Sequence, residues 1–173
     1  SKVLGAALLS LNYDVKVSEV HGMSQRGGSV VTYVRYGEEV HSPIVDLGQA
    51  DYMLAFEPLE AARYLPYLKK DGVIITNTRE TMPMPVITGA AQYPADVHQK
   101  LSERVDLVSV PAADYAKEAG SLKAVNVVLI GVMARYTDIP YEKWVQTIKT
   151  TVPPKFLEVN VKAFDLGYHM GKD

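Results

Sequence analysis

The sequence predicts an α/β protein with three layers, in which helices cover both faces of a mostly parallel, mixed sheet. Two observations carry this prediction. Apolar runs typical of strands buried on both faces occur at 51–56 and 73–76, and a segment with helical character follows the first of them. The chain has 173 residues, of which 47% are hydrophobic and 22% charged, so it can bury one substantial core. We therefore expect residues 1–173 to form a single domain.

The N-terminal part is predicted to contain a helix and then two strands. Residues 1–11 have a helical composition, and residues 13–20 alternate apolar and polar side chains as a strand does. Residues 29–36 are β-branched and aromatic, which predicts a second strand. A hairpin-like pairing of these strands would give the sheet an antiparallel part. A short partner strand is expected at 40–45, broken by Pro43.

Strands and helices alternate through the rest of the chain. Pro58 stands where a first helical residue is expected, so we predict a helix over 59–68 that is interrupted near Pro66. Three prolines predict extended, irregular chain over 79–94. For 126–136 a buried helix is expected and a strand is the alternative, because a short apolar run does not separate the two. The other expected elements are a strand at 105–110 and helices at 95–104, at 112–119, from 140, and from 154 to about 170.

A glycine-rich nonapeptide separates the two N-terminal strands. Its members are His21, Gly22, Met23, Ser24, Gln25, Arg26, Gly27, Gly28 and Ser29. Glycines allow another molecule to approach the backbone closely, successive N–H groups can bind an anion, and Arg26 adds a fork of donors. A tight turn would also need glycines for its geometry alone. On the pattern alone, a contact surface and a plain turn are equally good interpretations.

Residues 19–30 resemble the hallmark of the γ-type subunit of 2-oxoacid:ferredoxin oxidoreductases, most closely the branch that acts on indolepyruvate. Further matches follow in the same order as in the family, at 55–61, 63–66, 77–78, 126–131, 153–155, 160, 162–164 and 167–168. The resemblance favours a contact surface for the nonapeptide and implies a Rossmann-like fold. Members of the family begin with a strand and a Gly-x-Gly-Gly-x-Gly turn. This chain opens at Ser1 inside what resembles the next helix, so we expect a sheet that lacks that strand and turn.

The resemblance also implies an activity and partners. Enzymes of this family oxidatively decarboxylate 2-oxoacids to acyl-CoA and reduce ferredoxin. The resemblance places thiamine diphosphate and the Fe-S clusters on partner subunits, with CoA as co-substrate and ferredoxin as an indirect partner. This chain would complete the assembly and border the approach of CoA or substrate through the nonapeptide.

Composition excludes several other activities. The sequence has no cysteine, so it can form neither a disulfide nor a cysteine-ligated Fe-S cluster. Its four histidines (His21, His41, His98 and His169) lack the spacing of metal ligands, and no Gly-x-Ser-x-Gly elbow suggests a hydrolase. A net charge of −2 gives no pull toward nucleic acid or anionic membranes. No run of 18 apolar residues is present, and we expect a cytoplasmic protein.

Two polar residues follow the buried strands, where open α/β sheets place ligands. Glu57 could contact a ligand or partner, or it could stabilise the start of the following helix. Asn77 could line the same crevice or cap a turn. Met82 and Met84, which alternate with prolines, could form an adaptable docking strip or cover the edge of a core. No catalytic residue is assigned.

A second function stays open at this point. The chain could be a free-standing Rossmann-like module that binds a small anionic ligand, such as CoA or a nucleotide, through its glycine-rich turns.

Overall fold

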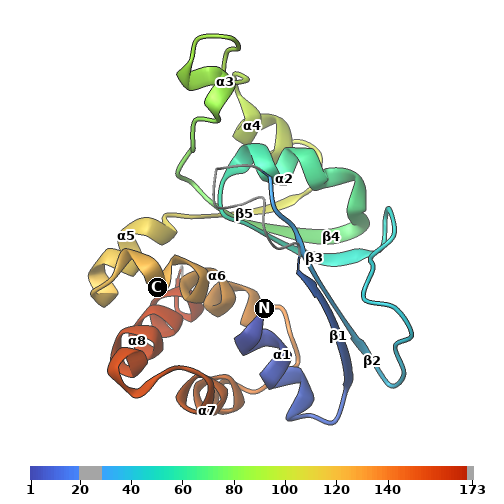
Figure 1. Ribbon diagram of the computed structural model, residues 1–173, viewed down its shortest axis with the longest axis vertical. Coiled ribbons are helices and arrows are strands. Elements are labelled where there is room, and N and C mark those ends of the chain that lie inside the picture. The colour runs from blue at the N-terminus through green and yellow to red at the C-terminus, as the bar shows by residue number, and fades with distance from the viewer. Residues whose placement is uncertain (20–28, 171–173) are drawn as a thin grey trace.

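The computed structural model of the protein describes residues 1–19 and 29–170. A parallel sheet with the strand order β3-β4-β5 forms its middle layer. The strands are β3 (Ala50–Ala55), β4 (Leu68–Asn77) and β5 (Asp106–Val110). One face of the sheet is covered by α2 (Pro58–Tyr64) and α4 (Val97–Ser102). The other face is covered by α6 (Val125–Ala134), with α5 (Ala112–Ala119) and α8 (Leu157–Tyr168) beside it (Figure 1). The predicted three-layer α/β arrangement is confirmed.

The N-terminal segment forms a helix and an antiparallel ribbon. Helix α1 (Lys2–Leu9) precedes β1 (Asp14–Glu19), which pairs with β2 (Thr32–Gly37) in a register that places Val17 opposite Val34. The antiparallel pairing is as predicted. In the described part of the chain, however, β1 and β2 form a two-stranded sheet of their own and do not join the parallel sheet.

The strand expected at 40–45 is absent. Pro43 has no N–H to donate to a ladder, and the neighbouring carbonyl groups find another donor. Arg35 Nη1 donates to the carbonyl oxygens of Ser42 and Ile44, at 3.2 and 3.0 Å. One guanidinium nitrogen thus satisfies two carbonyl groups of a segment that the sequence pattern assigned to the sheet.

Other differences concern where elements begin and end. Strand β4 begins at Leu68, well before the expected 73–76, because its first residues follow a 3₁₀ turn, η2 (Leu65–Tyr67), that contains Pro66. The segment 79–94 is mostly irregular, as predicted, but it includes one helical turn, α3 (Met84–Ile87). Residues 126–134 are helical, which rejects the strand alternative. The remaining elements are η3 (Leu122–Ala124), α7 (Tyr141–Thr151) and η4 (Pro154–Phe156).

Two hydrophobic cores lie on opposite faces of the parallel sheet. The larger core joins the sheet to α5, α6, α7 and α8 and contains the fully buried Trp144 and Phe164. The smaller core, with Ile74 and Leu101 among its members, lies beneath α2 and α4. No helix in the described ranges is long and apolar enough to cross a bilayer.

Helices α6 and α8 cross at glycines. A Cβ atom on Gly131 would collide with the carbonyl oxygen of Phe164 and lie 2.9 Å from the amide nitrogen of Tyr168. A Cβ atom on Gly167 would collide with the carbonyl oxygen of Val128. The two backbones therefore touch directly, and neither position has room for a side chain.

Candidate functional site

A cavity of about 1600 Å³ opens between the ribbon and the parallel sheet. Strands β2 and β3 form two of its walls, and residues of α1 and α6 contribute to it. Around the carboxyl end of β3 it is lined by Ser29, Phe56, Glu57, Met82 and Met84. Open α/β sheets bind ligands at this edge.

Glu57 lies two residues after the end of β3 and caps α2. Its Oε1 accepts a hydrogen bond from the backbone N–H of Glu60 at 2.9 Å, and its Oε2 accepts one from that of Leu59 at 3.1 Å. The side chain is buried, and the carboxylate compensates for backbone donors that the first turn of the helix leaves unpaired. Of the two interpretations of Glu57, the geometry shows the stabilising one.

A third donor reaches the same carboxylate from a distant segment. Tyr93 Oη donates to Glu57 Oε2 at 3.1 Å. Burial and the neighbouring Glu57 carboxylate both raise the pKa of Tyr93 well above its ordinary value. The phenol therefore stays protonated at neutral pH and remains a donor to Glu57. Sequence reasoning missed Tyr93, because nothing in a proline-rich segment links it to a residue 36 positions earlier.

The end of the nonapeptide lies beside the same helix. Ser29 Oγ donates to the carboxylate of Glu60 and lies 3.3 Å from Tyr64 Oη. Arg63 Nη1 holds the other oxygen of Glu60 at 2.7 Å. Helix α2 is therefore in contact with Ser29 at its exposed side. The other predicted contact residues, 21–28, lie outside the described residues.

Asn77 is on the other face of the sheet. Side chains alternate along a strand, so Asn77 shares the face of Val73 and Ile75, which belongs to the larger core. Glu57 instead caps a helix on the opposite face. That Asn77 could line the same crevice as Glu57 stays a prediction, and in the described residues the two side chains belong to opposite faces of the sheet.

The side chain of Asn77 has an unusual environment. It is 5% exposed, and its Oδ1 accepts no hydrogen bond from any described residue. A buried acceptor without a protein donor is destabilising unless a water or a bound molecule supplies one. Asn77 also ends β4 opposite Val110, at the carboxyl edge. It remains a candidate contact residue.

The described histidines are separated from one another. His98 contacts Ser109 Oγ at the surface, His41 Nε2 lies 3.8 Å from Glu39 Oε1, and His169 follows the last residue of α8. Within residues 1–19 and 29–170, no three His, Cys, Asp or Glu side chains are grouped so that they could hold a metal ion.

Replacing Glu57 with alanine should lower the free energy of unfolding by about 1–2 kcal/mol, because α2 loses its cap and Tyr93 loses its acceptor. Urea unfolding followed by circular dichroism measures this change. Glu57→Asp, which keeps a capping carboxylate, should recover part of the loss, and Glu38→Ala, at an exposed turn, should change little. Equal stability of Glu57→Ala and Glu38→Ala would contradict the capping role.

The architecture defines a class of protein. Helices on both faces of a parallel sheet, with a cavity beside the carboxyl end of a strand, are typical of Rossmann-like α/β proteins that bind a ligand or partner at that edge. The chain has the fold of this class, and its most similar relatives identify the family.

Residues 1–170 match the family described as pyruvate ferredoxin/flavodoxin oxidoreductase. The chain is 44% identical over 179 residues to indolepyruvate oxidoreductase subunit IorB of Thermococcus kodakarensis, with 100% of this chain and 89% of that protein covered. The chain belongs to the pyruvate ferredoxin/flavodoxin oxidoreductase family. The resemblance noted in the sequence is thereby confirmed.

Solved structures share the fold. The γ subunit of a keto/oxoacid ferredoxin oxidoreductase from Geobacter sulfurreducens aligns with a TM-score of 0.67 at 22% identity, over 96% of this chain and 86% of that chain. The 2-oxoglutarate:ferredoxin oxidoreductase from Magnetococcus marinus, with 2-oxoglutarate, coenzyme A and succinyl-CoA bound, aligns with a TM-score of 0.68 at 18% identity. That alignment covers 98% of this chain but only 27% of the other, so the fold also occurs as one part of a longer polypeptide.

Proposed function

We propose that this chain is the γ-type subunit of a cytoplasmic 2-oxoacid:ferredoxin oxidoreductase, with indolepyruvate or another aryl-pyruvate as the substrate of the complex. The observation that carries the proposal is the 44% identity, over the whole chain, to a subunit of an indolepyruvate oxidoreductase. The complex would oxidise and decarboxylate the 2-oxoacid, transfer the acyl group to CoA and pass the electrons to ferredoxin.

The redox chemistry of such a complex belongs on a companion subunit. Fe-S clusters are held by cysteine thiolates, and this sequence has none. The family resemblance implies that thiamine diphosphate is held by the companion as well. We assign both to the companion and no catalytic residue to this chain.

The role left for this chain is to complete the assembly. In this proposal, His21 to Ser29 form the contact, with Arg26 as the residue best suited to an anionic group of CoA or to a carboxylate of the companion. The contact of Ser29 with Glu60 supports it, because it fixes one end of the nonapeptide on α2. Asn77 joins the proposal because its buried Oδ1 has no donor among residues 1–19 and 29–170.

Reconstitution tests the assembly role. The companion subunit should show CoA-dependent oxidation of indolepyruvate, with ferredoxin or a viologen dye as the acceptor, only after this chain is added. With Arg26→Ala, activity should fall by at least tenfold at equal protein concentrations, because one charged contact of this kind contributes about 1.5–3 kcal/mol. Arg104→Ala, at an exposed position after α4, is the matched control and should keep full activity. Full turnover by the companion alone would refute the proposal.

The alternative, a free-standing module that binds a small anion, is separated by calorimetry on the isolated chain. A subunit that acts by assembly should bind CoA and nucleotides weakly or not at all when alone. Binding of either at micromolar concentration, together with no effect on the companion, would favour the alternative.

A further inference from the structure

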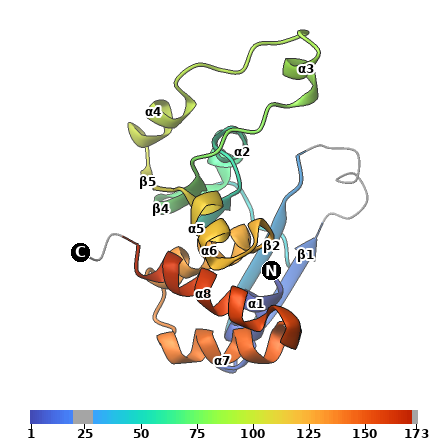
Figure 2. The same ribbon diagram turned by 90° about the vertical axis from the view of Figure 1, so that its left-hand side faces the viewer.

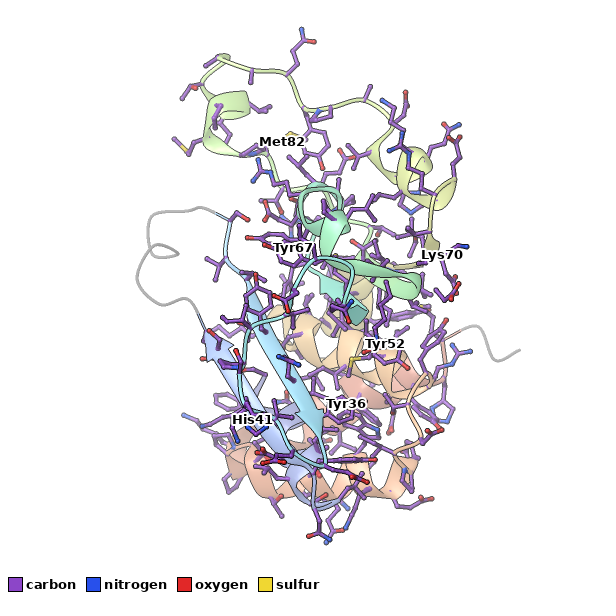
Figure 3. The ribbon with its side chains drawn as sticks, turned by 90° about the vertical axis from the view of Figure 1, so that its right-hand side faces the viewer. Tyr36, His41, Tyr52, Tyr67, Lys70 and Met82 are labelled. Atoms are coloured by element: carbon purple, nitrogen blue, oxygen red, sulfur yellow. The ribbon has the colours of Figure 1, made fainter. Side chains whose placement is uncertain are left out.

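Residues 78–96, here called the arm, leave the carboxyl end of β4 and return to α4. Only Pro83, Val86 and Tyr93 are half-buried in the arm, and its other residues are exposed. Figures 1 and 2 show the arm extending past α2 and α4, with α3 near its tip. In Figure 3, Met82 lies on the arm beyond Tyr67, which is at the end of η2. The arm covers little of its own protein.

The composition of the arm is that of an interface. Residues 81–95 contain no Asp, Glu, Lys or Arg, although charged residues make up 22% of the chain. Met82, Met84 and Ile87 are 41%, 59% and 64% exposed. Enrichment in methionine and depletion of charge characterise the centres of protein interfaces, and a cluster of exposed large apolar side chains marks an interaction site.

The arm is held in shape by hydrogen bonds. The backbone N–H groups of Ile87 and Thr88 donate to the carbonyl oxygens of Pro83 and Met84, at 3.1 and 2.9 Å, and Ala91 N donates to Pro85 O at 3.0 Å. Tyr93 then fixes the part of the arm that returns to α4, by its hydrogen bond to Glu57. Three prolines restrict the backbone further. A segment ordered in this way loses less entropy on binding than a free loop would.

The arm is continuous with the contact surface of the proposed function. Met82, Met84 and Ile87 line the same cavity as Ser29, the last residue of the nonapeptide. Phe56, which is 57% exposed, also lines this cavity and directly precedes the cap of α2. Together these side chains form one apolar surface at the carboxyl edge of the sheet.

We propose that the arm docks into an uncharged, apolar cleft of the larger companion subunit, with Met84 and Ile87 as its principal contacts. This inference rests on the proposed function. The continuity with Ser29 supports the companion as the occupant, since both segments then meet one partner. A second copy of this chain is the competing occupant that the experiment separates.

The test uses the full chain and the purified companion subunit. Met84→Asp and Ile87→Asp should each weaken binding and raise the dissociation constant at least tenfold, because each places an unpaired charge in an apolar cleft. Calorimetry or biolayer interferometry measures this change. Leu47→Asp is the matched control: Leu47 is 65% exposed, nearly the same as Ile87, and lies outside the arm. It should bind within twofold of the unmodified chain. A melting temperature equal to that of the unmodified chain in all three variants excludes misfolding.

Three other results would overturn the proposal. Wild-type affinity in both arm variants would remove the arm from the interface. An equal loss with Leu47→Asp would show a general effect of added negative charge. Loss of self-association in sedimentation, with companion binding unchanged, would make a second copy the occupant. If the unmodified chain itself failed to bind the companion, the proposed function would fail first, which distinguishes it from failure of the arm alone.

Discussion

Gly167→Ala should destabilise the protein by about 3 kcal/mol, at the upper end of the usual range for overpacking a core. The added Cβ would collide with the carbonyl oxygen of Val128 and lie 2.9 Å from its carbonyl carbon. Both atoms belong to the backbone, so no side chain can rotate away and α6 and α8 must separate. Separation would loosen the packing of Phe164, which is fully buried beside this crossing.

Equilibrium unfolding in urea measures this effect. The melting temperature should fall by about 2–4 °C for each kcal/mol of unfolding free energy that is lost. Gly5→Ala is the matched control. Gly5 is in α1, and a Cβ there would meet only Val17 Cγ2, at 4.0 Å. That substitution should be neutral or stabilise by up to about 1 kcal/mol, as expected for glycine to alanine in a helix. Similar effects of the two substitutions would mean that the helices do not cross as described.

Trp144→Ala should cost about 3–5 kcal/mol, whereas Trp144→Phe should cost less than about 1.5 kcal/mol. Trp144 is fully buried in α7, and its ring centre lies 6.1 Å from that of Phe164. Its Nε1 donates to no described residue. Phenylalanine therefore sacrifices no hydrogen bond and retains most of the apolar contact, while alanine leaves a cavity.

Urea unfolding followed by circular dichroism compares the two variants, because the only tryptophan of the chain is lost in both and fluorescence cannot report. Phe156→Ala, at a position that is 48% exposed, provides the control and should change stability by no more than about 0.5 kcal/mol. If phenylalanine proved as costly as alanine, the indole nitrogen would have a role that its surroundings do not show.

Elements with strong local signals were predictable from the sequence. The apolar run that became β3 and the proline that begins α2 were predictable, because a short apolar run and a fixed φ leave few alternatives. Burial on both faces was not found for β3, which is an edge strand of the described sheet and mostly half-buried. The segment 40–45 was not predictable. The carbonyl groups of Ser42 and Ile44 accept hydrogen bonds from Arg35 in β2. No local sequence pattern indicates that a side chain, and not a neighbouring strand, will donate to them.

The site residues likewise divide into features that a local sequence pattern predicts and features that depend on the tertiary structure. The cap at Glu57 followed from its place before Pro58. Its contact with Tyr93 depends on the route of the arm, which only the tertiary structure gives. Asn77 could be placed at a strand end, but not on a face, because the apolar run 73–75 that precedes it reads the same on both sides of the sheet.

Helix α2 is a shared anchor for two segments that are far apart in the sequence. Its side chain Glu60 holds Ser29, and its cap Glu57 holds Tyr93. Glu57 and Glu60 are three residues apart at the start of α2, so a displacement at either contact is transmitted through the first turn of one helix. In a complex that contacts both the arm and the nonapeptide, the binding free energies of the two segments would not simply add. Binding of one segment would already order part of the other, so the second would lose less conformational entropy.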